Sequence, residues 1–556
     1  MGDTAEPRSH EGASAEIDWT SLARPEAYPG DPSARFGVEE IQTHISRVFL
    51  TRERVYKFRK PVDLDFVCFR SRAQRNADCL REVTLNRRLA RDVYLGVAPL
   101  EHGESGARIG PVAETLPAGP GPSPAEHCVV MRRLPAGFDA LTLLSKRQLG
   151  REAIERTAER IAHFHRDHGL GVPAPFTPEE WREVCVEPVE ANFRALARAD
   201  LGAREAGLTE RARARVREVA ERLGDRFERR RRAGRAVDGH GDLHLEHVWF
   251  GRDGGGPWII DCLEFSDALR RIDAACDVAF LAMDLHYRGA PQLAEGLLRR
   301  YAREMDDFDL YGVVDFFASY RAGVRAKVAA IAARDPAIER DQARRAAGSV
   351  LRHLELTERL LRPRSSGRLV LVGGVIGTGK SRVAEALAEA HGGVVISSDR
   401  VRKRLLGVAA TERLRAGWRQ DAYAPEVTDR VYDALLERAR PVVESGRTAF
   451  LDATFARRVD REKARRWAAE NGIPSFFVEV RCERAIVLAR LARRAATGGD
   501  PSDAGPELYR QSAAAFEPVE EWPPENHEVL RTETRSWRSR IAALGLGARA
   551  RAPSRT

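Results

Sequence analysis

The spacing of apolar residues changes along this chain of 556 residues, and the changes divide it into regions. Residues 1–36 are polar and rich in Gly, Pro and Ser, which predicts a disordered leader. Beyond them, alternating runs predict strands and runs with three- and four-residue spacing predict helices, so residues 37–361 are expected to form one domain of α+β structure. Its first predicted elements are a helix soon after Val38, a hairpin over 48–58, a helix over 78–91 and a strand over 127–131.

A second region begins after residues 362–367, whose Pro, Ser and Gly predict a linker. Short apolar runs then alternate with helical periodicity, which predicts an α/β domain over residues 368–533 with a parallel sheet between helices. Residues 534–556 are expected to be a basic tail. Strands are predicted over 368–373, 394–396, 448–451 and 475–480, and helices over 381–391, 426–445, 457–471 and 483–496.

The turn between the first strand and helix of this second domain fits G-x-x-x-x-G-K-[ST] at every fixed position, the pattern of a P-loop. Its glycines let backbone N–H groups face a polyphosphate, and the start of the helix adds partial positive charge. Lys380 is predicted to reach the β and γ phosphates of ATP, and Ser381 to ligate Mg²⁺. The motif consists of Gly374, Val375, Ile376, Gly377, Thr378, Gly379, Lys380 and Ser381.

Acidic residues follow the next two strands, at the sheet edge where ligands of open α/β folds bind. Asp399 is placed to accept a proton from an acceptor hydroxyl, and the alternative is that it caps the helix beginning there. Arg402 shares a helical face with Asp399 and suits an acceptor anion or the transferred phosphoryl group. Asp452 is predicted to hold Mg²⁺ through water or to bind the acceptor.

Arginines gather on the last predicted helix of the domain, just before a Gly-rich stretch over residues 497–503. Cations beside a mobile loop suit a lid that closes over ATP and neutralises charge in the transition state. The candidates are Arg490, Arg493 and Arg494.

Together these elements resemble the small P-loop kinase superfamily, which includes gluconate kinases, chloramphenicol phosphotransferases, polynucleotide 5′-hydroxyl kinases and zeta toxins. The resemblance covers residues 368–533. It implies that Asp399 is the general base, that Arg402 is an acceptor-side ligand, and that Arg490 or Arg494 is a lid residue. It also implies ATP and Mg²⁺ as cofactors.

A second candidate site lies in the first domain, at His240, Gly241 and Asp242. A carboxylate in such a tight loop can orient an acceptor hydroxyl. Asp261, at the end of a short predicted strand, can hold Mg²⁺ against phosphates. Upstream, Lys57 on a strand and Glu82 on the next helix suit a phosphate-binding Lys and its partner, while Lys60 is a competing candidate.

This second set resembles the aminoglycoside phosphotransferase family, which shares the protein-kinase fold, over residues 37–361. The resemblance implies that Asp242 is the catalytic acid/base and Asp261 the metal ligand, and that Asp277 supports the catalytic loop. The two signatures in this order resemble bacterial proteins described as bifunctional aminoglycoside phosphotransferase-like and ATP-binding proteins.

Two positions depart from that family pattern. The pattern has a metal-binding Asn five residues after the catalytic Asp, where this chain has His247, and neutral imidazole is a poorer Mg²⁺ ligand than an amide oxygen. The turn over residues 51–54 lacks G-x-G-x-x-G. A kinase-shaped domain without transferase activity is therefore the alternative. A zinc site made by His240, His244 and His247 is not favoured, because the H-G-D context accounts for these residues.

Composition limits the partners and the location. The net charge of +9 is compatible with nucleic acid, but the charges are dispersed, so a nucleic-acid partner is not favoured. Seven scattered cysteines without C-x-x-C spacing favour a reducing cytoplasm. No stretch approaches eighteen apolar residues and the N-terminus lacks an apolar core, so neither membrane spanning nor secretion is expected.

The sequence therefore predicts an ATP-dependent phosphotransferase that moves the γ-phosphate of Mg-ATP to a hydroxyl of a small molecule. The C-terminal domain is the main expected catalytic unit. One alternative makes the N-terminal domain a non-catalytic ligand sensor that regulates the C-terminal domain, and another makes the chain a polynucleotide or tRNA kinase. The acceptor and the oligomeric state do not follow from these patterns.

Overall fold

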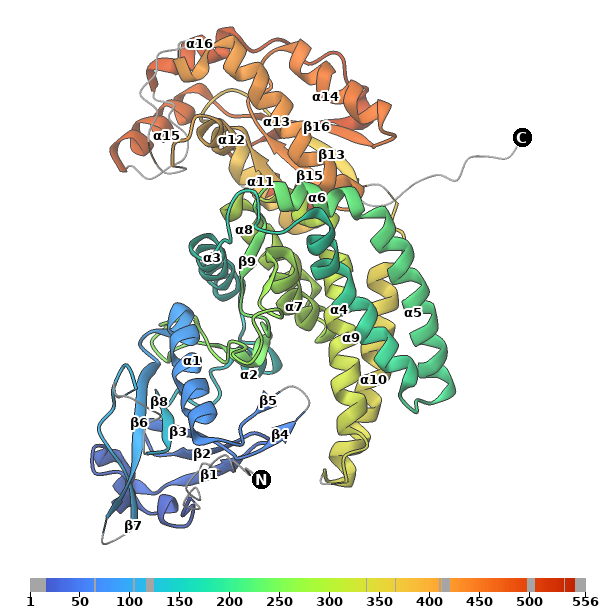
Figure 1. Ribbon diagram of the computed structural model, residues 1–556. Helices are drawn as coiled ribbons and strands as arrows, with labels where there is room; N and C mark the ends of the chain where they lie inside the picture. Colours follow the sequence, from blue (N-terminus) through green and yellow to red (C-terminus); the bar gives the residue numbers. More distant parts are fainter. Residues whose placement is uncertain are drawn as a thin grey trace, which may run out of the picture. The chain divides into compact units, whose positions relative to one another are not determined.

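A computed structural model shows how these regions fold (Figure 1). The chain divides into two compact units: the first contains residues 1–170 and 236–277, and the second contains residues 171–235 and 278–556. The structure describes residues 17–64, 67–103, 106–116, 125–336, 338–365, 367–409, 412, 421–497, 506–534 and 536–545.

The first unit contains a six-stranded antiparallel sheet, in the order β1-β2-β3-β8-β6-β7. Helix α1 (Arg72–Ala90) packs on one face through Cys79 and Val83, and begins in a capping box made by Ser71 and Gln74. The strands are β1 (Glu39–Gln42), β2 (Ser46–Leu50), β3 (Arg54–Arg59), β6 (Tyr94–Gly103), β7 (Gly106–Ile109) and β8 (His127–Arg132).

Two predictions for this part are wrong. The helix expected after Val38 is strand β1, whose four residues are exposed and pair along β2. Residues 17–36 are not a disordered leader, because they form 3-10 turns that place Leu22 and Tyr28 in a core with β2 and β3. These turns are η1 (Ser21–Ala23), η2 (Pro25–Ala27) and η3 (Pro32–Phe36).

Shorter elements complete the first unit and carry its H-G-D loop between β9 and η4. They are β4 (Asp63–Leu64), β5 (Val67–Cys68), α2 (Ala140–Ser145), α3 (Arg151–Asp167), β9 (Ala236–Asp238), η4 (Leu245–His247), β10 (Val248–Trp249), β11 (Trp258–Ile259) and β12 (Arg271–Asp273).

Long helices make up the first part of the second unit, as their apolar spacing predicts. Within the described part of the chain, no helix combines the length and the apolar character needed to cross a membrane. The helices are α4 (Pro178–Arg198), α5 (Ala203–Arg222), α6 (Gly224–Arg232), α8 (Pro291–Met305), η5 (Phe308–Gly312), α9 (Val314–Ala332) and α10 (Arg340–Leu361), and α7 (Ala274–Tyr287) precedes α8 in the chain.

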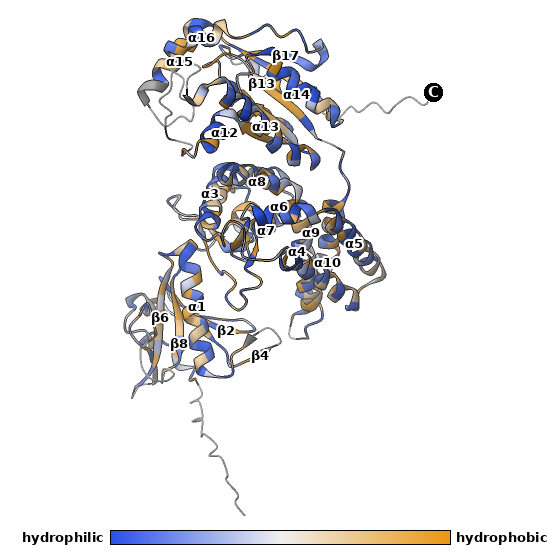
Figure 2. Cartoon of the chain, turned by 45° about the horizontal axis from the view of Figure 1, so that its top comes forward, coloured by the Kyte–Doolittle hydropathy of each residue, from blue (hydrophilic) through white to orange (hydrophobic). Residues whose placement is uncertain are grey.

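The C-terminal part of the second unit is built on a five-stranded parallel sheet in the order β14-β15-β13-β16-β17. Figure 2 colours much of β13 as hydrophobic, as expected for a strand with helices on both faces. The strands are β13 (Arg368–Gly373), β14 (Val394–Ser397), β15 (Thr448–Asp452), β16 (Ser475–Arg481) and β17 (His527–Arg531). The helices are α11 (Lys380–His391), α12 (Ser398–Leu405), α13 (Pro425–Glu444), α14 (Arg458–Glu470), α15 (Arg484–Thr497), α16 (Tyr509–Ala514) and α17 (Trp537–Ala543).

The domain does not end at residue 533. Helix α17 lies within the residues expected to be a basic tail, and its Trp537 and Ile541 are buried in one core with Val383 and Leu387 of α11. The basic-tail prediction is therefore wrong for residues 537–543.

Ion pairs join the helical part of the second unit to its sheet. Arg447, directly before β15, is buried and donates to Glu295 of α8 (2.9 Å) and to Asp315 of α9 (3.0 Å). Arg438 of α13 pairs with Asp306 at the C-cap of α8 (2.7 Å). Because a buried charge is costly without its partner, these pairs hold the helices and the sheet in one arrangement.

Truncation tests the corrected boundary. Removing residues 535–556 takes Trp537 and Ile541 out of the core, and each buried apolar side chain contributes about 1.5–3 kcal/mol. We expect the amides of β13 and α11 to exchange hydrogen faster in this truncated chain than in the full chain, as measured by mass spectrometry of peptides from each protein. Removing only residues 546–556 is the control and should leave the exchange rates unchanged. Equal rates for both truncations would contradict the role assigned to α17.

Candidate functional site

The P-loop motif forms the turn between β13 and α11. Gly374 has a φ of +142°, and a Cβ added there would lie 2.3 Å from the carbonyl oxygen of Val480. Gly377 and Gly379 also have positive φ values, so the turn requires glycine. Lys380 Nζ donates to the carbonyl oxygen of Val375 at 3.1 Å, within the turn.

The register of the parallel sheet brings the acidic residues to this turn. Val372, near the end of β13, pairs with Asp452 of β15, and Asp452 pairs on its other side with Ser397 of β14. Asp399 follows two residues later, in the first turn of α12. The N-cap of α12 is Ser397, so the alternative that Asp399 caps this helix is wrong.

Asp452 lies against the residues predicted to handle phosphate and metal. Burial raises the pKa of Asp452 to about 6, and nearby Asp399 adds to the increase, while the charge of Lys380 and a hydrogen bond with the Ser381 side chain oppose it. A carboxylate and a hydroxyl are the oxygen ligands that Mg²⁺ favours. Ser381 and Asp452 therefore fit an Mg²⁺ ion.

A cavity of about 390 Å³ opens at this sheet edge and contains most of the predicted residues of the domain. Lys380, Ser381, Asp399, Arg402 and Asp452 all line it. Sequence reasoning missed other lining residues, because only folding brings them here from the 3-10 turn Asp421–Tyr423, from α13, from the turn after β15 and from the start of α14. They include Tyr423, Thr428, Tyr432, Thr454, Arg457 and Asp460.

Arg402 is the cation of this cavity with the most enclosed side chain. It is only 6% exposed, and its guanidinium lies 4.6 Å from the ring centroid of Tyr423. Its Nη1 donates to the carbonyl oxygen of Ala422 at 2.7 Å. Among the described residues its Nε has no hydrogen-bond partner, although buried donors are normally paired. Arg402 therefore has capacity for an anionic ligand.

Of the three arginines predicted to form a lid, the side chains of two are described, and Arg493 is exposed on α15. Arg490 does not line the cavity described above; it donates to the carbonyl oxygen of Thr378 in the P-loop (3.3 Å) and to the Thr532 hydroxyl (2.9 Å). It therefore links the P-loop to the residue after β17. The side chain of Arg494 and residues 498–505 lie outside the described residues.

In the first unit, Lys57 and Glu82 meet as the sequence predicts for a phosphate-binding Lys and its partner. Lys57 Nζ lies 3.0 Å from Glu82 Oε1 and 3.2 Å from Asp261 Oδ1. Burial lowers the pKa of Lys57, but the two carboxylates outweigh it and the net pKa lies above the usual value. Lys60, the competing candidate, instead donates to the Thr43 carbonyl oxygen at 2.7 Å.

A buried arginine, Arg59, contacts Glu82 of this pair and was not predicted from the sequence. Arg59 donates to Glu82 (2.6 Å), Asp78 (2.5 Å) and Glu264 (2.8 Å). It is two residues from Lys57 on β3, and Glu82 therefore accepts from both cations. Burial and the neighbouring Glu82 raise the pKa of Glu264 to about 7, against the opposing charge of Arg59.

Asp277 organises the H-G-D loop. Its carboxylate accepts from the backbone N–H of His240 (2.7 Å) and of Gly241 (3.0 Å), and it lies 2.9 Å from His165 Nε2. Burial raises the pKa of Asp277, but these hydrogen bonds and the nearby imidazoles bring it below its usual value. This is the supporting position that the sequence resemblance implied.

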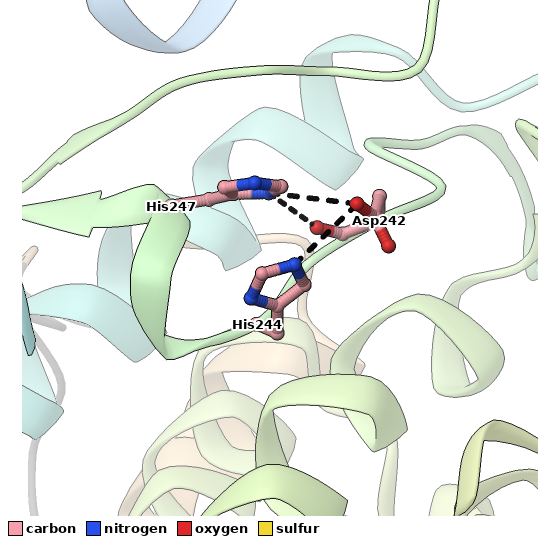
Figure 3. A group of neighbouring side chains, drawn as sticks. All are labelled: Asp242, His244 and His247. Carbon is pink, nitrogen blue, oxygen red and sulfur yellow. Dashed lines mark hydrogen bonds and ion pairs between the residues drawn. The ribbon is translucent and has the colours of Figure 1, made fainter. Parts of the chain in front are cut away.

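Asp242 is surrounded by two imidazoles, as Figure 3 shows. His247 Nδ1 lies 2.8 Å from the Asp242 carbonyl oxygen, and His244 Nε2 lies 3.4 Å from the Asp242 carboxylate. Burial raises the pKa of Asp242, but the imidazoles outweigh it and keep the carboxylate ionised. His247 Nε2 lies 3.5 Å from Asp261 Oδ2, so the two predicted metal ligands are neighbours.

Asp261 and His247 differ in how well they suit Mg²⁺ as ligands. Asp261 offers carboxylate oxygens, which suit a hard cation, and the charge of Lys57 lowers its pKa. His247 offers a ring nitrogen, which suits softer divalent ions. The first unit thus has the acidic residue expected for a kinase site but not its usual all-oxygen ligand set.

Comparisons with known proteins match both domains. The phosphotransferase enzyme family model matches residues 51–317, and an AAA domain model matches residues 369–519. The chain thus carries an aminoglycoside phosphotransferase-type domain of kinase-like fold, followed by a P-loop kinase-like domain, in the order predicted from the sequence.

Two solved structures are similar to separate parts of the chain. A gluconokinase from Sinorhizobium meliloti is 21% identical, with a TM-score of 0.23, over 33% of this chain and 91% of its own. A choline/ethanolamine kinase family protein from Mesorhizobium loti is 15% identical, with a TM-score of 0.34, over 61% of this chain and 98% of its own.

Two mycobacterial proteins match most of the chain. Uncharacterized proteins of Mycobacterium tuberculosis (strain ATCC 25618 / H37Rv) and Mycobacterium bovis (strain ATCC BAA-935 / AF2122/97) are each 33% identical over 483 residues, which is 86% of this chain and 90% of theirs. This chain therefore belongs to the same family as these mycobacterial proteins, and it joins a phosphotransferase enzyme family domain to a P-loop AAA domain.

Proposed function

We propose that the C-terminal domain transfers the γ-phosphate of Mg·ATP to a hydroxyl of a small molecule. The observation that carries this proposal is the sheet register, which brings Lys380, Ser381, Asp399 and Asp452 to one cavity of about 390 Å³. Cavities of this size hold small ligands, and the P-loop supplies a place for phosphates.

Each residue has a distinct task in this proposal. Lys380 exchanges its bond to the Val375 carbonyl oxygen for bonds to phosphate oxygens, and Ser381 and Asp452 hold the metal. Asp399 accepts the proton of the acceptor hydroxyl. Bound Mg·ATP supplies the phosphoryl group, and the ion neutralises charge that develops on it. Catalysis then depends on position and charge, as is usual for phosphoryl transfer.

The acceptor is proposed to carry an anionic group near its reactive hydroxyl. Arg402 supports this, because its buried guanidinium has an unpaired Nε among the described residues and lines the same cavity as Asp399. A carboxylate or phosphate on the acceptor would pair with that cation. Hydroxy acids and sugar phosphates are therefore better candidates than neutral polyols.

The N-terminal domain is proposed as a second ATP-dependent phosphotransferase site. The observation in its favour is the contact of Lys57 with both Glu82 and Asp261, since kinase-like sites use such a Lys on the phosphates. Asp242, held by the loop that Asp277 organises, is the proposed acid/base. The sensor role is the alternative outcome of the tests below.

Photolabelling with 8-azido-ATP tests nucleotide binding in each domain separately, because proteolysis assigns the label to peptides. We expect Lys380→Ala to reduce labelling of the C-terminal domain about 10- to 100-fold, the effect of losing charge-assisted hydrogen bonds. Lys57→Ala should reduce labelling of the N-terminal domain by a similar factor. Lys463→Ala, which removes a half-exposed Lys of α14, is the control. Unchanged C-terminal labelling in Lys380→Ala would refute the main proposal.

A panel of hydroxy acids, sugar phosphates and neutral polyols tests the acceptor class with labelled ATP. Arg402→Gln should lower kcat/KM for anionic acceptors roughly 10- to 100-fold, because a buried charge-assisted hydrogen bond is lost. Arg465→Gln, on the exposed side of α14, is the matched control. Preferential labelling of neutral polyols, with no effect of Arg402→Gln, would show that the acceptor is not anionic.

A further inference from the structure

The most unusual feature of the N-terminal site is an imidazole where a kinase-like site normally offers an amide oxygen to the metal. His247 is largely buried, and its ring is fixed by its neighbours. Its Nδ1 lies 2.8 Å from the carbonyl oxygen of Asp242. A carbonyl oxygen can only accept, so Nδ1 carries the proton, and in the neutral ring Nε2 keeps its lone pair.

The available nitrogen of His247 is directed at Asp261. Nε2 lies 3.5 Å from Asp261 Oδ2, which is too long for a hydrogen bond of normal strength. Two atoms that each bind one ion at about 2.1 Å lie roughly 3.0–3.4 Å apart, depending on the angle between them. The pair is therefore close to the separation at which both atoms can bind one cation.

A ligating imidazole commonly donates its other N–H to a backbone carbonyl, which fixes the tautomer and orients the ring. The bond from His247 to Asp242 provides that support within the loop itself. Asp261, for its part, is held by Lys57 through its other oxygen, Oδ1, at 3.2 Å. Each of the two ligands thus has one polar atom anchored and the other turned toward its partner.

His244 lies in the same loop, with its ring centroid 3.9 Å from that of His247, and its nitrogens face Asp242 and Glu246. Its Nε2 lies 3.4 Å from the Asp242 carboxylate (Figure 3), and its Nδ1 lies 3.8 Å from Glu246. Because His247 Nδ1 donates to the Asp242 carbonyl oxygen, only Nε2 of His247 can bind a metal. Nε2 faces Asp261 and not a site shared by Asp242 and His244. The geometry favours the pair of His247 and Asp261 as the ligands.

We propose that the N-terminal domain binds its nucleotide with a first-row transition ion such as Mn²⁺ in preference to Mg²⁺, with His247 Nε2 and Asp261 as protein ligands. Ring nitrogen binds Mn²⁺, Co²⁺ and Zn²⁺ better than Mg²⁺, whereas the carboxylate accepts all of them. This inference rests on the nucleotide role proposed above for this domain. Metal binding is measured without turnover, so failure of the metal proposal is distinguishable from failure of the proposed phosphoryl transfer.

Pulsed electron paramagnetic resonance of Mn²⁺ with ADP tests the proposal on the intact chain. Coordinated imidazole nitrogen modulates the electron spin echo of Mn²⁺, and among the described residues that line the C-terminal cavity there is no histidine to produce this signal. We expect the imidazole signal in the wild type and in His244→Asn. It should be lost in His247→Asn and in His247→Gln, with thermal midpoints confirming that these variants are folded.

Competition with Mg²⁺ gives a second readout. His247→Asn restores an amide oxygen, so we expect about ten-fold less Mg²⁺ to displace Mn²⁺ from this site than in the wild type. Absence of an imidazole signal in the wild type would overturn the proposal. Loss of the signal in His244→Asn with retention in His247→Asn would also overturn it, because the metal would then belong to Asp242 and His244.

Discussion

The parallel register of β13, β15 and β14 is the constraint on which the C-terminal site depends. Parallel strands end at the same edge of a sheet, so pairing of Val372 with Asp452, and of Asp452 with Ser397, fixes where the P-loop and the two acidic residues meet. A shift of one residue would turn the Asp452 side chain to the other face of the sheet. The site therefore follows from strand pairing, and the buried ion pairs of Arg447 hold the helices of the second unit against that sheet.

The N-terminal site depends on paired charge instead. Lys57 and Arg59 share Glu82, and Asp277 holds the H-G-D loop by its backbone N–H groups. Buried charges with partners on several elements tolerate few arrangements, because each lost partner leaves a charge uncompensated. Such a network is suited to presenting Asp261 beside Lys57, whether the domain transfers phosphate or reports nucleotide binding to the C-terminal domain.

Contiguous motifs were predictable from the sequence, and distant pairings were not. The P-loop and both fold types follow from local patterns, and the family models match the same two domains. Strand β1 was not predictable, because Glu39–Gln42 is exposed and owes its conformation to β2. Helix α17 was missed because Trp537 and Ile541 are two apolar residues in a basic stretch. The partners of Arg59 lie up to 205 residues away, and Ala422 and Tyr423 enclose Arg402 only after folding.

Transfer of labelled γ-phosphate from ATP into a pool of small metabolites and RNA tests the central claim most directly. We predict label in the small-metabolite fraction, reduced about 10²- to 10⁴-fold in Asp399→Asn through loss of the proposed general base. Asp242→Asn should remove a different product if the N-terminal domain also transfers phosphate, and no product if it is a sensor. Label that enters RNA, or metabolite labelling undiminished in Asp399→Asn, would contradict the function proposed for the C-terminal domain.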